Sequence, residues 1–264
     1  MPTVSEIERV LDEKAPFHIQ MSFDNAGFLV GDGAKLVNRI LVALDITEEV
    51  IAEAKEFGAE LIVSHHPVIF FPAKRVRAED PLGRKLICLV KNDIAAICCH
   101  TNLDAVAGGV NDILAERAGL THVEQLHQDG VDGEGRPYGI GRVGELTQPM
   151  PFADYLAFLK RNLDPNGLRY VDAGKLVRRV AVGGGACANM IEDVLAKGCD
   201  TFVTSDVKYD GFLDAKALGL NLVDAGHFPT EDVVCPQLVD WLKEAFPEVE
   251  VRKSERHYEV ICYG

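Results

Sequence analysis

The class of fold is set by Asn38-Arg-Ile-Leu-Val-Ala-Leu-Asp45 and by the two elements that follow it. Its continuous apolar run predicts a buried strand. Thr47 is a suitable N-cap for a helix over residues 48–57, and Gly58 is suited to end that helix. A second short apolar strand is predicted over residues 61–64. A strand, a helix and a strand in this order predict a βαβ unit with parallel strands.

The same alternation continues along the chain. Further helices are predicted over residues 82–91, 110–118 and 152–163, and further strands over residues 94–99, 140–146 and 177–182. The stretch 125–137 is rich in Gly and Asp, which predicts a loop or a domain boundary. We therefore expect an α/β fold with mixed, mostly parallel sheets.

Two parts of the chain resemble each other. Val42-Ala-Leu-Asp45 with the following helix and strand corresponds to Val182-Gly-Gly-Gly185 with its own helix and strand, 140 positions later. His100-Thr-Asn-Leu-Asp104 corresponds to His227-Phe-Pro-Thr-Glu231 at a shift of 127. Identity between the copies is low, and the alternative is a chance likeness of two generic βαβ units. The likeness predicts two similar α/β/α layered domains, residues 1–125 and 126–264, whose elements can interlock.

Composition and charge narrow the class of protein. The 264 residues include 27 Lys and Arg against 41 Asp and Glu, so the net charge of −14 argues against nucleic-acid binding. The N-terminus lacks the apolar core of a signal peptide, and no apolar run approaches the ~18 residues that cross a bilayer. Seven cysteines without a C-x-x-C pair indicate reduced, buried thiols. We expect a soluble cytoplasmic protein that binds no membrane.

A histidine doublet follows the second strand. Ser64-His65-His66-Pro67 lies where open α/β sheets place their ligand sites, at the carboxyl end of a strand. Consecutive side chains of an extended segment point to opposite sides, but at a turn His65 and His66 can serve two neighbouring ions. The alternative for each histidine is an ordinary hydrogen-bonded residue.

Two carboxylates and a third histidine also follow predicted strands. Asp104 and His227 lie at the same sheet edge if the strands are parallel, and Glu231 comes four residues after His227 at the start of a helix. Imidazole and carboxylate ligands suit Zn, Mn, Fe or Ni, and the absence of Cys ligands argues against a structural zinc site. The spacing predicts a metal site on His65, His66 and these three residues.

Five histidines lie outside this predicted ligand set. His100 is a candidate ligand, a partner of a ligand or a proton shuttle, and the sequence does not choose among these roles. Four more lack acidic partners at a suitable spacing and are expected at the surface: His18, His122, His127 and His257. Asp206 occupies the position of His66 in the second copy, but its neighbours argue against a bound cation there.

A glycine motif offers a rival site. Val182-Gly-Gly-Gly-Ala-Cys-Ala188 fits G-x-G-x-x-A between a strand and a helix, and Asp206 ends the next strand, as in a dinucleotide site. The equivalent turn of the first copy has Asp45 and Thr47 in place of glycines, so the duplication does not support this interpretation. Tight backbone packing, or a phosphate-sized subsite beside the metals, are the alternatives.

The motifs together resemble the family of NGG-interacting-factor-like (NIF-like) proteins, also named GTP cyclohydrolase I type 2. The matching segments run in order along nearly the whole chain: Ser22-Phe-Asp-Asn-Ala-Gly-Phe-Leu-Val-Gly31, Ser64-His-His-Pro67, His100-Thr-Asn-Leu-Asp104, Gly183-Gly-Gly185 and Asp224-Ala-Gly-His-Phe-Pro-Thr-Glu231. Phe23 departs from the Trp of many members. The chain resembles the short form, which lacks an inserted domain.

The resemblance implies more than the spacing does. It implies a dinuclear centre of two divalent ions on His65, His66, Asp104, His227 and Glu231, with the glutamate bridging. It also implies a ring-shaped homohexamer. Metals ~3.5–4 Å apart activate water and polarise an electrophile, which favours hydrolysis of a small anionic substrate such as a nucleotide. The family name suggests opening of the GTP imidazole ring, with His100 as proton shuttle.

Two alternatives to this activity stay open. A metal-dependent phosphoesterase uses the same ligands. A non-catalytic metal-binding scaffold or regulatory protein that acts through protein partners is the other alternative, because a structural metal pair would need the same residues.

Overall fold

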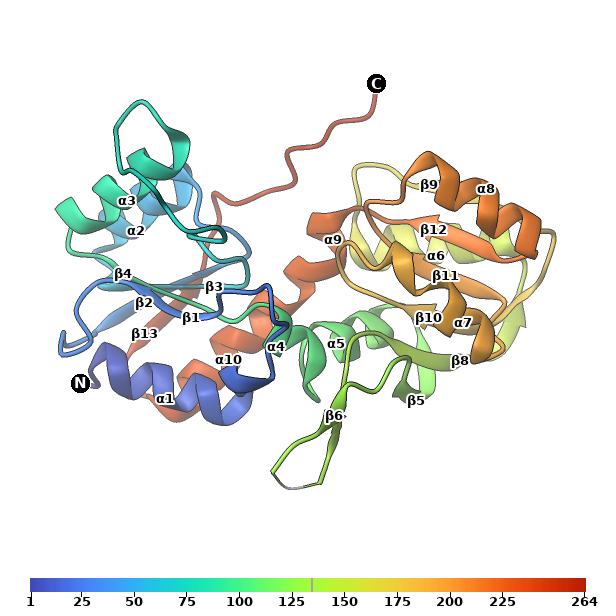
Figure 1. Ribbon diagram of the computed structural model, residues 1–264, viewed down its shortest axis with the longest axis horizontal. Coiled ribbons are helices and arrows are strands. Elements are labelled where there is room, and N and C mark those ends of the chain that lie inside the picture. Colours follow the sequence, from blue (N-terminus) through green and yellow to red (C-terminus); the bar gives the residue numbers. More distant parts are fainter. Residues whose placement is uncertain (134) are drawn as a thin grey trace. The chain divides into compact units, whose positions relative to one another are not determined.

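A computed structural model describes residues 1–133 and 135–264 (Figure 1). The contacts of the chain divide it into two compact units. Unit 1 comprises Met1–Leu103 and Val234–Tyr258, and unit 2 comprises Asp104–Val233 and Glu259–Gly264. The chain therefore returns to unit 1 after completing most of unit 2.

Unit 1 contains a five-stranded sheet in the order β1-β4-β3-β2-β13. Its strands are β1 (Gly27–Val30), β2 (Arg39–Ala43), β3 (Leu61–Ser64), β4 (Ala95–Cys98) and β13 (Glu250–Lys253). β2, β3, β4 and β13 run parallel to one another, whereas β1 is antiparallel to its neighbour β4. Ser64 is paired with Cys98, so the segments that follow β3 and β4 leave the sheet side by side.

Helices cover both faces of this sheet. They are α1 (Val4–Lys14), α2 (Glu48–Phe57), α3 (Pro81–Lys91) and α10 (Cys235–Ala245), with a 3₁₀ turn at Phe17–Ile19. In Figure 1, α2 and α3 lie on one face, and α1 and α10 lie on the other. Leu41 and Ile62 are buried against the first pair together with Val50 and Leu89. Full burial of each such side chain contributes ~1.5–3 kcal/mol, which fixes the layers.

The helix predicted over residues 48–57 forms with the predicted ends. Thr47 Oγ1 accepts a hydrogen bond from the backbone N–H of Val50 at 3.2 Å. Gly58 adopts a left-handed conformation with φ of 74°, which ends the helix at little steric cost. The start of β3 is thereby placed for parallel pairing with β2.

Unit 2 contains a six-stranded sheet in the order β5-β8-β10-β11-β12-β9. Its strands are β5 (Leu120–Gln125), β8 (Arg142–Met150), β9 (Arg169–Val171), β10 (Val177–Val182), β11 (Thr201–Thr204) and β12 (Asn221–Asp224). The central β10, β11 and β12 are parallel, and the flanking strands are antiparallel. The predicted α/β class with mixed sheets is confirmed.

The helices of unit 2 also form two layers around a sheet. They are α5 (Val110–Arg117), α6 (Phe152–Leu163), α7 (Ile191–Ala196), α8 (Tyr209–Leu218) and α9 (His227–Glu231); α4 (Thr101–Ala105) crosses from unit 1. Val180 and Val182 pack against α5 and α6, whereas the intervening Ala181 packs with Phe202 against α7 and α8. This alternation is the two-residue period of a strand buried on both faces.

The parallel centres of the two sheets follow the same order of elements. β2-α2-β3-α3-β4 in unit 1 corresponds to β10-α7-β11-α8-β12 in unit 2, as the sequence repeat predicts. The Gly- and Asp-rich stretch also holds a small hairpin, β6 (Gly130–Val131) with β7 (Pro137–Tyr138). Within the described residues, no helix is long and apolar enough to cross a membrane.

The cysteines are free thiols, but they are not all buried. Cys98, Cys99, Cys199 and Cys235 are buried, as expected, whereas Cys88 and Cys262 are exposed. The expectation of burial was wrong for these two, because Cys88 lies on the outer face of α3 and Cys262 lies in the C-terminal tail beyond β13.

Candidate metal centre

His65 and His66 lie in a bend directly after β3, where the backbone continues alongside β2. Their N–H groups donate to the carbonyls of Ala43 at 3.3 Å and Leu44 at 2.8 Å. Ser64 Oγ donates to the His66 carbonyl at 2.8 Å and holds the bend. The ring centroids of the two histidines are 4.9 Å apart, so the turn brings consecutive side chains together.

Each ring of the doublet has its Nδ1 engaged by an oxygen. Nδ1 of His65, which is fully buried, lies 2.8 Å from the Cys99 carbonyl, and Nδ1 of His66 lies 2.8 Å from Asp45 Oδ1. A carbonyl only accepts, so Nδ1 of His65 carries the proton, and a metal would bind through Nε2. Burial opposes ionisation of Asp45, but hydrogen bonds from His257 and His66 outweigh it and hold the pKa of this carboxyl well below its ordinary value.

His100 follows β4 and is held in the same manner. Its Nδ1 lies 2.7 Å from Asp24 Oδ1, and Asp24 Oδ2 accepts the Thr101 N–H at 3.0 Å. Burial raises the pKa of Asp24, but the hydrogen bonds from His100 and Thr101 lower it by more. The net result is a pKa of about 2. Asp24 is thus an ionised partner of His100 at neutral pH.

Three of the histidines of unit 1 form one cluster. Ring nitrogens of His65, His66 and His100 all lie within 4.8 Å of one another, close enough that they could hold a metal ion. The fold thus brings together the doublet predicted from the sequence and the histidine whose role the sequence left open.

In unit 2, His227 begins α9 and faces the glutamate one turn later. Its Nε2 lies 2.9 Å from Oε2 of Glu231, which is buried, and its Nδ1 lies 2.7 Å from Asp206 Oδ2. The sequence argued against a cation at Asp206 but did not identify it as the partner of a histidine. The repeat could have indicated this, because Asp206 follows β11 as His66 follows β3.

The three consecutive glycines allow the backbone to approach this pair. Gly185 has φ of 64°, and a Cβ there would lie 2.0 Å from Glu231 Oε1 and 3.2 Å from His227 Nε2. The N–H of Gly184 donates to Asn111 Oδ1 at 2.9 Å, and that of Gly185 donates to Thr230 Oγ1 at 3.1 Å. These amides therefore hold protein side chains in place of a pyrophosphate, which supports the tight-packing interpretation over a dinucleotide site.

Asp104 is a buried carboxylate on α4. Asn111 Nδ2 donates to its backbone carbonyl at 2.9 Å, which fixes the turn that carries it. Burial, followed by the charges of Asp104 and Glu231, raises the pKa of the Cys187 thiol. The two candidate carboxylate ligands, Asp104 and Glu231, therefore both act on the Cys187 thiol beside the glycine motif.

Of the four histidines expected at the surface, three are exposed and one is not. His18, His122 and His127 lie in solvent. The side chain of His257 is only 7% exposed and lies against Asp45, with Nε2 3.2 Å from Oδ2. The expectation was wrong for His257 because its acidic partner is 212 positions away in the chain.

Comparisons with known proteins agree with this fold. Residues 2–259 match the model of the Duf34/NIF3 (NGG1p interacting factor 3) family. A relative from Clostridium perfringens, named GTP cyclohydrolase 1 type 2 homolog, is 39% identical over 242 residues, 91% of each chain. A relative of that name from Streptomyces coelicolor is 38% identical over 88% of this chain and 82% of its own. The crystal structure of a Bacillus cereus protein related to NIF3 has a TM-score of 0.94 at 27% identity, covering 100% of this chain and 99% of that one.

Proposed function

The chain belongs to the Duf34/NIF3 family, and from this membership we propose that it is a metal-dependent hydrolase of a nucleotide or another phosphate-bearing small molecule. Two divalent ions, Zn, Fe, Mn or Ni, would be held by His65, His66, Asp104, His227 and Glu231. His100, with ionised Asp24 as its partner, would move a proton to or from the substrate.

One observation carries this proposal. Each of the histidines at the ends of β3, β4 and β12 has its Nδ1 held at 2.7–2.8 Å by a carboxylate or a carbonyl. Ligating histidines almost always donate their other ring nitrogen in this way, which fixes the tautomer and the ring orientation. Three of these partners are carboxylates: Asp45, Asp24 and Asp206.

The donor set fits hard or borderline divalent cations, and its charge fits an anionic substrate. When bound, such a pair supplies Lewis acidity and lowers the pKa of water towards ~7. Asp104 and Glu231 neutralise only part of the charge of two divalent ions. The remaining positive charge would attract phosphate oxygens. Asp24 would stabilise His100 after it has accepted a proton.

GTP is the first substrate to test, because the two relatives described above are named as GTP cyclohydrolase 1 type 2 homologs. In that reaction the purine imidazole ring is opened by water. His100 would then take the proton from the attacking water or return it to the ring nitrogen.

The experiment is a metal analysis combined with a substrate screen. Purified protein is expected to hold about two metal ions per chain and to turn over GTP or another nucleotide or phosphoester. His66→Ala and Glu231→Ala should each lose metal and turnover, whereas His18→Ala, at an exposed histidine, should keep both. Less than one metal per chain under metal-replete conditions would refute the site. Full metal with no turnover on any tested class would favour the scaffold alternative.

The assembly and location belong to the same proposal. We infer a cytoplasmic homo-oligomer, a ring-shaped hexamer, from the family resemblance. Light scattering coupled to gel filtration should give six times the chain mass of 28.8 kDa. A monomer at micromolar concentration would contradict it.

A further inference from the structure

We propose that His257 is a positioning residue, which holds Asp45 in the orientation that His66 needs in order to bind a metal. This inference rests on the proposed function for the role of His66 as a ligand. The contacts that carry it all lie within unit 1 and connect the C-terminal segment after β13 to the end of β3.

Asp45 engages a different histidine with each carboxylate oxygen. Oδ1 lies 2.8 Å from Nδ1 of His66, and Oδ2 lies 3.2 Å from Nε2 of His257. The backbone N–H of Asp45 also donates to Nδ1 of His257 at 3.4 Å. Because Nδ1 of His257 accepts, its Nε2 carries the proton and donates to the carboxylate. A carboxylate held at both oxygens has one preferred rotation, which in turn sets the His66 ring.

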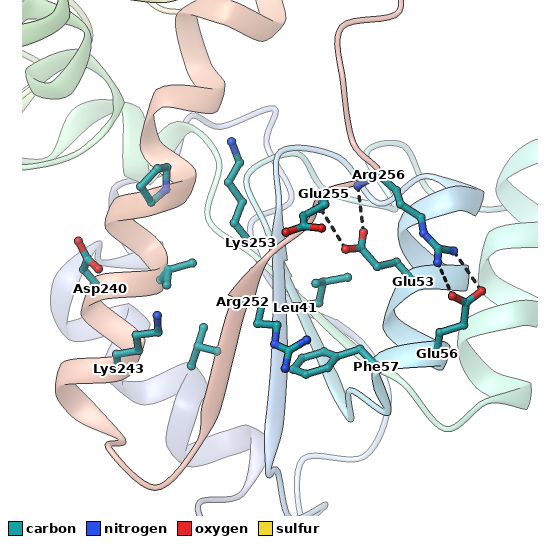
Figure 2. A pocket seen from close by; sticks show the side chains of 13 residues that line it. Leu41, Glu53, Glu56, Phe57, Asp240, Lys243, Arg252, Lys253, Glu255 and Arg256 are labelled. Atoms are coloured by element: carbon teal, nitrogen blue, oxygen red, sulfur yellow. Dashed lines mark hydrogen bonds and ion pairs between the residues drawn. The ribbon is translucent and has the colours of Figure 1, made fainter.

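Two glutamates of α2 fix the segment that carries His257. Glu53 accepts hydrogen bonds from the Ser254 hydroxyl and from the N–H groups of Glu255 at 3.0 Å and Arg256 at 3.2 Å. Glu56 forms a two-point ion pair with the Arg256 guanidinium, one of whose contacts is 3.1 Å. Figure 2 shows both glutamates pointing from α2 towards this segment. We call Glu53, Glu56 and residues 254–256 the C-terminal anchor.

The anchor borders an open pocket, so one side of these polar contacts faces solvent and not the core. A cavity of about 630 Å³ adjoins it and is lined by Glu53, Glu56 and Arg256 together with residues of β13 and α10 (Figure 2). Removing a charge of the anchor should therefore release the segment without opening the buried core. His257 variants and anchor variants are expected to act in the same direction.

The first test needs no metal. Histidine labelled with ¹⁵N reports the tautomer of His66 in the metal-free protein, and the Nδ1–H form should predominate. His257→Ala should give His66 a mixture of tautomers, and Glu53→Gln should do so to a smaller extent. His257→Gln keeps an N–H donor and should restore the wild-type spectrum. His127→Ala is the control at an exposed histidine. An unchanged His66 spectrum in folded His257→Ala would overturn the proposal.

The second test measures binding of Co²⁺, whose absorption reports ligand geometry. Loss of a partner that orients a ligand typically lowers metal affinity by roughly 10–100-fold. We expect His257→Ala to lower Co²⁺ affinity by roughly 10-fold, because His257 acts on the ligand through Asp45. His257→Gln should bind Co²⁺ as the wild type does. Unchanged affinity and spectrum would contradict positioning of a ligand. If the wild-type protein binds no Co²⁺ but the tautomer of His66 still shifts in His257→Ala, the proposed function fails while His257 remains a positioning residue.

Discussion

Asp206 Oδ2 lies 2.7 Å from Nδ1 of His227, which gives His227 the same kind of partner that Asp45 gives His66. In the sequence repeat, however, Asp206 occupies the position of His66 itself, 140 residues later. The two halves therefore keep a polar residue at the end of the same strand but use it differently. In unit 1 this residue is His66, a proposed metal ligand. In unit 2 it is Asp206, which holds the ring of the proposed ligand His227.

Asp206→Ala should weaken metal binding without unfolding the protein. Asp206 is exposed, so its loss opens no cavity, but His227 loses the oxygen that fixes its ring. We expect affinity to fall roughly 10–100-fold. Titration calorimetry with Zn²⁺ measures this, and Asp206→Asn, which keeps an oxygen acceptor, should lose less. Asp214→Ala removes an exposed carboxylate of α8 as the control, and an equal loss in that variant would refute a specific role for Asp206.

Gly185→Ala and Gly198→Ala form a matched pair. Both glycines have positive φ, 64° and 70°, so each alanine costs ~1–2 kcal/mol of backbone strain. Only at Gly185 would the new Cβ meet Glu231, 2.0 Å from Oε1, whereas nothing lies within 4 Å at Gly198. Gly185→Ala should therefore lose metal as well as stability, and Gly198→Ala stability alone. Urea unfolding and elemental analysis give the two readouts, and full metal content in Gly185→Ala would contradict the expectation.

Local signals made much of the fold predictable. The apolar run of β2, the Thr47 cap and the Gly58 stop act over a few residues, and the predicted helix matches α2 at both ends. β1 and β13 were not predicted, although they are as long as β3 and β4. The sequence of β13 is Glu-Val-Arg-Lys, which lacks an apolar run, and its partner β2 lies more than 200 positions away in the chain. Only the tertiary pairing shows that the chain returns to its first sheet.

The positions of the candidate histidines at strand ends could be predicted from the sequence, whereas their hydrogen-bond partners could not. His65 and His66 come directly after an apolar strand, and His227 comes three residues after one, which is a local pattern. Asp45 and His257 become partners only when β13 brings the C-terminal segment beside β2, and no spacing rule spans that distance.

Arg142 is a buried guanidinium that connects β8 to the turn following Asp104. It donates to the carbonyls of Ala105 at 3.3 Å and Val106 at 3.0 Å and pairs with Asp112. Arg142→Met would remove one donor from each of these acceptors, although Ala105 and Val106 keep the N–H groups of Gly139 and Gly109. The partly exposed Asp112 also loses its cation, so we expect a loss of ~1–3 kcal/mol of unfolding free energy. Arg178→Met, at an exposed arginine of β10, should change the unfolding free energy by less than ~0.5 kcal/mol. Equal urea midpoints for the two variants would rule out this role.

Asp24 should give the protein a specific loss of stability in acid. Its pKa is about 2 in the folded state, because the hydrogen bonds from His100 and Thr101 outweigh burial, against about 3.9 in an unfolded chain. The folded state therefore binds fewer protons in this range, and stability falls as the pH falls. The contribution is fully present above pH ~4 and is lost as the pH drops through ~2.

Asp24→Asn removes this titration and provides the comparison. In metal-free protein, the difference in unfolding free energy between wild type and Asp24→Asn should be constant from pH 7 to about 5 and should shrink between pH ~4 and ~2. Urea unfolding at closely spaced pH values measures it, with Asp214→Asn as the control for removing one negative charge. A difference that stays constant down to pH ~2.5 would show that Asp24 is not held ionised by His100 and Thr101.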